Sequence, residues 1–62
     1  MSNVEEVLMK RDKLTKDEAH RQKNYARELI MEAIENGDFD DVEDIMYSEL
    51  GLEMDYIDEM IF

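Results

Sequence analysis

The chain has 62 residues, a net charge of −11, 44% hydrophobic residues, no cysteine and one histidine, His20. A chain of this length makes one domain, residues 1–62, with a thin core, and its composition excludes disulfides, thiolate or multi-histidine metal sites and an intrinsically disordered acidic tail. Because no apolar run approaches the ~20 residues that cross a bilayer and the first residues are polar and acidic, we expect a cytoplasmic protein without a signal peptide or membrane contact.

The first predicted helix lies near residues 3–11. Two overlapping capping boxes stand at its start, in which Ser2 is followed by Glu5 and Asn3 by Glu6 at the required spacing of three. Apolar residues then recur at intervals of three and four, the period of one helical face. We expect a short helix whose first turn is capped by its own neighbouring side chains.

The second predicted helix lies near residues 16–36 and carries the strongest sequence signals. Thr15 and Glu18 form another capping box, which places the start of the helix at the residue after Thr15. Apolar residues hold one face for about five turns. The sequence Asn36-Gly37 then supplies a left-handed C-terminal cap, because glycine adopts a positive φ without steric cost.

Two further helices are predicted, near residues 40–50 and 54–61. Asp38 or Asp40 can cap the third helix, and Gly51 ends it, with Leu52 placed to fold back onto Tyr47. No alternating apolar pattern indicates a strand. We therefore expect an all-α fold, a miniature bundle of three or four helices.

The charge is divided between the two halves of the chain. Residues 1–27 contain all seven basic side chains and five acidic ones, whereas residues 28–62 contain thirteen carboxylates and no lysine or arginine. A negative surface repels nucleic acid and anionic membranes, and it attracts cationic protein surfaces. We expect no direct binding to nucleic acid and a protein partner with a cationic surface.

Four basic side chains form a ladder beside the apolar face of the second helix: Lys16, His20, Lys23 and Arg27. One interpretation is a contact site for an acidic partner or a phosphate. The other, which we favour, is an internal seam of ion pairs with the acidic third or fourth helix.

The acidic half is the candidate binding surface. Rows of carboxylates on a rigid scaffold can imitate the charge of a nucleic-acid backbone and occupy the cationic cleft of a nucleic-acid-handling protein. The alternative is a solvated face that only confers solubility. The candidate residues are Glu28, Glu32, Glu35, Asp38, Asp40, Asp41, Glu43, Asp44, Glu49 and Asp55.

The same carboxylates do not form a metal-binding or catalytic motif. A calcium-binding EF-hand loop that starts at Asp38 fails, because its fifth position is Val42 and its sixth is Glu43. A chain this short can hardly enclose the pocket that shifts the pKa values of catalytic carboxylates. We therefore expect no enzyme, no cofactor and no metal site.

Two apolar side chains are candidate partner anchors. By the helical count, Tyr25 and Met31 lie away from the central apolar stripe of the second helix. Tyrosine is frequent at protein interfaces and methionine adapts to irregular surfaces.

Three segments resemble small acidic proteins of bacteriophages and prophages: Lys10–Ala19, Asn36–Asp38 and Leu50–Tyr56. The similarity covers nearly the whole chain, and its motifs are capping and turn signatures. Such proteins often inhibit host machinery, so the resemblance implies a phage-type inhibitor of restriction, CRISPR or DNA-repair enzymes that acts in the host cytoplasm.

These observations favour a non-enzymatic binding protein whose acidic surface mimics nucleic acid and blocks a host nucleic-acid-handling or defence protein, as anti-CRISPR or anti-restriction proteins do. One alternative is a structural or regulatory adaptor, possibly a homodimer, because a small core benefits from self-association. A second alternative is a switch that depends on a metal ion.

Overall fold

A computed structural model of the chain describes residues 3–61. Its elements are α1 (Asn3–Asp12), α2 (Lys16–Glu35), α3 (Phe39–Ile45), the π-helical turn η1 (Met46–Leu50), the 3₁₀ turn η2 (Met54–Tyr56) and α4 (Ile57–Ile61). No strand occurs among the described residues. The all-α prediction is confirmed, and each predicted helix boundary differs from the observed one by at most one residue, with α3 and η1 together forming the third predicted helix.

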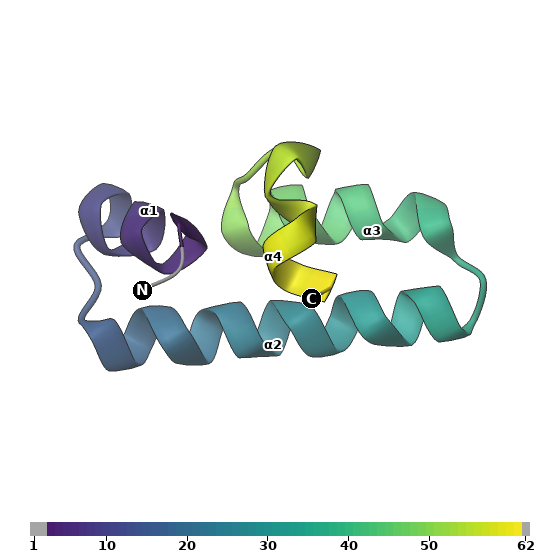
Figure 1. Cartoon of the computed structure of the whole chain (residues 1–62), viewed down its shortest axis with the longest axis horizontal. Coiled ribbons are helices and arrows are strands. Elements are labelled where there is room, and N and C mark those ends of the chain that lie inside the picture. Colours follow the sequence, from purple (N-terminus) through teal and green to yellow (C-terminus); the bar gives the residue numbers. More distant parts are fainter. Residues whose placement is uncertain (1–2, 62) are drawn as a thin grey trace.

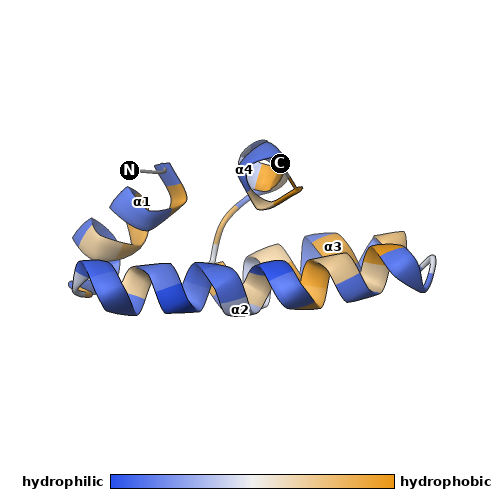
Figure 2. Cartoon of the chain, turned by 60° about the horizontal axis from the view of Figure 1, so that its bottom comes forward, coloured by the Kyte–Doolittle hydropathy of each residue, from blue (hydrophilic) through white to orange (hydrophobic). Residues whose placement is uncertain are grey.

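The long helix α2 forms the spine of the molecule (Figure 1). Its 20 residues span about 30 Å at 1.5 Å per residue, which accounts for most of the 33 Å length of a body 17 Å across. The helix α1 packs on the N-terminal half of α2, and α3 returns along its C-terminal half. Figure 2 shows that α1 and α4 lie on the same side of α2 while α3 lies alongside it. The molecule therefore has an α1 end and an α3 end.

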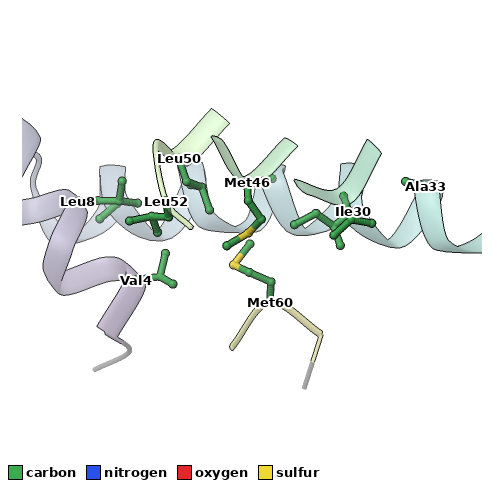
Figure 3. Close-up of a cluster of buried hydrophobic side chains, with 11 residues drawn as sticks. Val4, Leu8, Ile30, Ala33, Met46, Leu50, Leu52 and Met60 are labelled. Carbon is green, nitrogen blue, oxygen red and sulfur yellow. The ribbon is translucent and has the colours of Figure 1, made fainter. Parts of the chain in front are cut away.

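A thin core runs along the spine. The side chain of Ile30 is fully buried, whereas the other buried apolar residues of α2 are alanines, which let the neighbouring helices approach closely. Met46 of η1 and Met60 of α4 point toward one another near the middle of the molecule (Figure 3). The buried apolar residues are Val4, Leu8, Ala19, Ala26, Ile30, Ala33, Val42, Met46, Leu50, Leu52 and Met60.

Local capping determines both ends of α2, as predicted. The Glu18 N–H donates to Thr15 Oγ1 at 3.2 Å, and the Thr15 N–H donates to Glu18 Oε1 at 2.9 Å, which completes the capping box. At the other end, the Gly37 N–H donates to the carbonyl of Ile34 and the Asp38 N–H to that of Ala33, the two hydrogen bonds of a Schellman motif. Asp38 precedes α3 but makes no side-chain capping bond.

The capping box makes the stability of the fold depend on pH. The hydrogen bond from the Thr15 backbone lowers the pKa of Glu18 below its ordinary value of 4.5, and the bond with the Thr15 side chain lowers it further. A carboxyl group with a lowered pKa in the folded state stabilises the fold above its unfolded pKa, and this contribution is lost as the pH falls through the folded pKa. We expect Glu18→Ala to lower the melting temperature at pH 6 and to have a smaller effect below pH 4.5. Thermal melting across this range, with exposed Glu28→Ala as the control, checks the prediction.

The N-terminus of α1 is capped from the opposite end of the chain. Glu59 of α4 accepts hydrogen bonds from the Asn3 N–H at 2.8 Å and the Val4 N–H at 2.9 Å. Asn3 is the first helical residue, so the predicted role of Asn3 as an N-cap is wrong. The predicted role of Ser2 falls outside the described residues. A carboxylate at a helix N-terminus pairs with free N–H groups and with the positive end of the helix dipole, so this contact fastens α4 to α1.

The C-terminus of η1 is held by side chains from the first two helices. Gln22 of α2 donates to the Glu49 carbonyl at 2.8 Å, and Arg11 of α1 donates to the carbonyls of Leu50 at 2.6 Å and Gly51 at 3.1 Å. These carbonyls lack partners within their own helix. Three consecutive carbonyl groups are therefore satisfied by residues distant in the sequence, and the end of η1 is fixed against α1 and α2.

Candidate partner-binding surface

The ion pairs of the described residues lie at the α1 end of the molecule. Glu5 is buried, and its carboxylate lies 3.7 Å from Lys23 Nζ and 3.5 Å from His20 Nδ1. The remaining ion pair joins Arg11 and Asp12, whose pKa is lowered by the hydrogen bond from the Arg11 guanidinium. Within the part of the chain described, no ion pair involves a carboxylate beyond Arg27, and all acidic residues of this half except Glu49 and Glu59 are exposed.

This geometry corrects the prediction for the basic ladder. Lys23 is half-buried and pairs with Glu5 of α1, not with a residue of the third or fourth helix, and the exposed His20 lies beside the same carboxylate. Lys16 and Arg27 are exposed. Only Lys23 is therefore internal, the other three members of the ladder are exposed, and no ion pair among residues 3–61 joins the ladder to the acidic half.

A groove lies between α2 and α3 on the acidic half. It has a volume of about 320 Å³, and its polar lining consists mainly of carboxylates. Glu32 comes from α2, Asp38 from the turn, and Asp41 and Asp44 from α3, where residues three apart lie on one side of a helix. Because the Schellman motif fixes the turn between the two helices, these four carboxylates are held on a rigid frame. We name these four residues the acidic groove.

A second hollow lies on the other side of α3, where η1 and the segment before α4 meet. It has a volume of about 490 Å³ and is lined by Glu43, Asp44, Tyr47, Leu52, Glu53, Met54 and Asp55. Asp44 also lines the acidic groove, so the negative surface continues around α3 from one hollow to the other. Asp40 borders a third hollow, at the turn, with Asp38 and Asp41.

The predicted acidic residues therefore fall into four groups. Glu32, Asp38, Asp41 and Asp44 form the acidic groove, and Asp40, Glu43 and Asp55 lie around the same end of the molecule. By helical count Glu28 and Glu35 lie on the face of α2 opposite its buried residues, away from the groove, and both are exposed. Glu49 is half-buried, and its position is constrained by the hydrogen bond at its carbonyl.

The two predicted apolar anchors are exposed, Tyr25 by 55% and Met31 by 38%. Tyr25 precedes Leu29 and Glu32 by four and seven residues, which places it on the groove side of α2. Met31 lies on a different side of the helix. Their role in binding stays a prediction.

Sequence reasoning missed two more exposed aromatic side chains, Phe39 at 66% and Tyr47 at 77% exposure. Leu52 is buried as expected, but it does not cover the Tyr47 ring. Phe39, Glu43 and Tyr47 recur at intervals of four along the border of the buried stripe of Val42 and Met46, and this spacing could have indicated an exposed aromatic stripe.

Further features bear on the kind of site. Among residues 3–61 no group of three or more His, Asp and Glu side chains is arranged to hold a metal ion. None of the described helices is long and apolar enough to span a membrane. No family model, curated protein or solved structure matches the chain. The acidic groove is therefore the main candidate binding surface of the described residues.

Proposed function

We propose that this chain is a non-enzymatic inhibitor that binds the cationic, nucleic-acid-binding surface of another protein through its acidic groove. The observation that carries the proposal is the convergence of four carboxylates from α2, the turn and α3 on one groove, in a half of the chain that has no lysine or arginine. Lysine and arginine side chains that normally contact phosphates could pair with these carboxylates instead.

The charge density of the groove supports mimicry of a nucleic-acid strand. Asp41 and Asp44 lie on the same side of α3, about 4.5 Å apart along its axis. A single strand of B-form DNA carries one charge per ~3.4 Å along its axis, a comparable density. Glu32 on the facing helix adds a charge across the groove. The helices already place the backbone of the groove, so the conformational entropy lost on binding comes mainly from the four exposed side chains.

The resemblance to small acidic phage proteins supports the inhibitory role within this class of binding proteins. A phage-encoded chain would encounter restriction, CRISPR or DNA-repair enzymes in the host cytoplasm, and each has a cationic channel for nucleic acid. Under this proposal the chain itself does not bind nucleic acid, because its field repels phosphates.

Neutralising the groove is expected to abolish capture of the partner. The variant Glu32→Gln, Asp41→Asn, Asp44→Asn should bind at least about tenfold more weakly than the wild type, because it removes the facing charges without removing core side chains. The matched control is Glu6→Gln, Asp17→Asn, Glu28→Gln, which changes the net charge equally at exposed positions away from the acidic groove. The control should stay within about twofold of the wild type.

The measurement is capture from a bacterial lysate at low salt with the tagged chain, followed by elution in a salt gradient and mass spectrometry. The proposal requires a nucleic-acid-binding protein, elution at moderate salt and competition by a DNA or RNA duplex, since screened charges and a shared site both weaken the complex. If the groove variant retains the same partner, or if nucleic acid does not compete, the proposal is wrong. Recovery of the chain alone would favour a homodimeric adaptor instead.

A further inference from the structure

A groove lined by apolar side chains lies where the C-terminal part of α2, the start of α3, η2 and α4 meet. Its volume is about 360 Å³. Phe39 and Met54 at its edges are 66% and 38% exposed, so apolar surface is open to solvent here. All six lining residues are apolar: Ile34, Phe39, Val42, Met54, Ile57 and Ile61. We name these six residues the apolar groove.

The side chains beside the apolar groove carry a single sign of charge. Five of the six lining residues have an acidic neighbour in the chain that is itself exposed. No lysine or arginine follows Arg27, so nothing in this half of the chain neutralises them. The acidic neighbours are Glu35 after Ile34, Asp38 and Asp40 around Phe39, Asp41 and Glu43 around Val42, Glu53 and Asp55 around Met54, and Asp58 after Ile57.

This charge pattern determines what can occupy the groove. Two copies of the chain that met through it would bring two acidic rims together, which is unfavourable. A segment with apolar side chains flanked by lysine or arginine would bury its apolar side chains in the apolar groove. Its basic side chains would pair with the surrounding carboxylates. The occupant is therefore a basic, amphipathic segment of another protein.

The backbone N–H and C=O groups of the occupant must also find hydrogen-bond partners. Residues of α2, α3, η2 and α4 form the groove, and no strand edge borders it, so its floor offers no row of donors and acceptors to an extended strand. An extended segment would leave N–H and C=O groups unpaired against apolar side chains, at a cost that a helix avoids. A helix satisfies its own hydrogen bonds.

We propose that the apolar groove binds an amphipathic helix of the partner, with bulky apolar side chains on one face and lysine or arginine on its flanks. This inference rests on the proposed function and names the partner element that the chain recognises. The acidic groove on the opposite side of α3 engages the nucleic-acid site, while the apolar groove engages a neighbouring helix. Anchors at positions i, i+3 or i+4 and i+7 of that helix would meet the floor.

A synthetic peptide of about 18 leucine and lysine residues, patterned as an amphipathic helix, is the probe. One control peptide has the same composition in an order that spreads leucine around the helix, and another has glutamate in place of lysine. We expect the patterned peptide to bind at least about tenfold more tightly than either control by isothermal titration calorimetry. Methyl NMR of labelled methionine should show a large shift for Met54 and none for Met9, which lies in α1.

The matched variants are Phe39→Ala and Tyr25→Ala, which both remove an exposed aromatic ring, only the first from the apolar groove. Phe39→Ala should weaken peptide binding about tenfold, while Tyr25→Ala should leave it within about twofold, and circular dichroism should show both folded. Equal binding of the reordered peptide, equal effects of the two variants or an equal shift of Met9 would each overturn the inference.

The two proposals can fail separately. If the patterned peptide does not bind but the variant neutralised in the acidic groove still loses its nucleic-acid-binding partner, only the helix-docking inference is wrong. If the peptide binds as expected but nucleic acid does not compete for the captured partner, the proposed inhibition of a nucleic-acid site is wrong and the chain is a helix-binding adaptor.

Discussion

Replacing Ile30 by alanine is expected to lower the free energy of unfolding by about 3 kcal/mol, within the 2–5 kcal/mol typical of buried Ile→Ala changes. The remaining buried apolar side chains of α2 are all alanines, so Ile30 supplies the only large, fully buried contact that the described part of this helix makes with the core. A chain of 62 residues has a total stability on the order of 3–9 kcal/mol, so the variant should be partly unfolded at 37 °C.

The neighbouring change Met31→Ala is the matched control, because Met31 lies on the same helix but is 38% exposed. It should cost less than about 1 kcal/mol. Urea unfolding followed by circular dichroism at the helical band gives both values. Similar losses for the two variants would mean that α2 is not packed through the Ile30 face.

Replacing Gly51 by alanine is expected to be the most costly change in the turns, about 2–3 kcal/mol. Its φ of +64° costs a residue with a Cβ roughly 1–2 kcal/mol. The added Cβ would also lie 2.9 Å from Arg11 Nη1, which donates to the Gly51 carbonyl. Displacing the guanidinium weakens the hydrogen bonds that fasten η1 to α1, a further contribution of about 1 kcal/mol.

Gly37 provides a matched comparison that separates the clash with Arg11 from the backbone strain. Its φ is +77°, but a Cβ there meets no atom within 4 Å, so Gly37→Ala should cost only the backbone strain of about 1–2 kcal/mol. In an Arg11→Ala background, Gly51→Ala should cost no more than Gly37→Ala does. A Gly51→Ala cost that is unchanged by removal of Arg11 would contradict the proposed clash.

The fold was largely predictable because the sequence signals that start and end its helices are local. The Thr15–Glu18 capping box and the positive-φ glycines Gly37 and Gly51 act within a few residues, so spacing alone located the ends of α2 and η1. The cap of α1 was not predictable, because Glu59 lies more than fifty residues from Asn3. Nothing in the local spacing distinguishes such a carboxylate from a solvated one.

The ion pair of Glu5 and Lys23 also shows that local spacing does not identify partners distant in the sequence. The helical count correctly placed Lys23 beside the apolar stripe, but it could not choose between acidic partners on different helices. Glu5 reads as a capping residue in the sequence, and packing of α1 on α2 makes it the buried partner of Lys23. The choice depends on which helices become neighbours, which is a property of the assembled fold.

For the candidate site, the sequence identified the acidic residues but not their grouping. Division of the carboxylates between two sides of α3 follows from the antiparallel pairing of α2 and α3 and from the crossing of α4. Phe39 directly follows the acidic turn, and no local pattern there shows whether its ring is buried. The position of α4 instead leaves Phe39 at the edge of an apolar groove.

The separation of charge along the spine also affects how the molecule would meet a partner. Basic side chains gather on α1 and the first half of α2, and carboxylates gather around α3 and α4, so the centres of positive and negative charge lie apart on a body 33 Å long. In the field of a cationic surface such a molecule experiences a torque that turns its acidic end forward before contact. Collisions would then be biased toward the binding orientation, and this gain in association rate would fade as salt shortens the range of the field to about 8 Å.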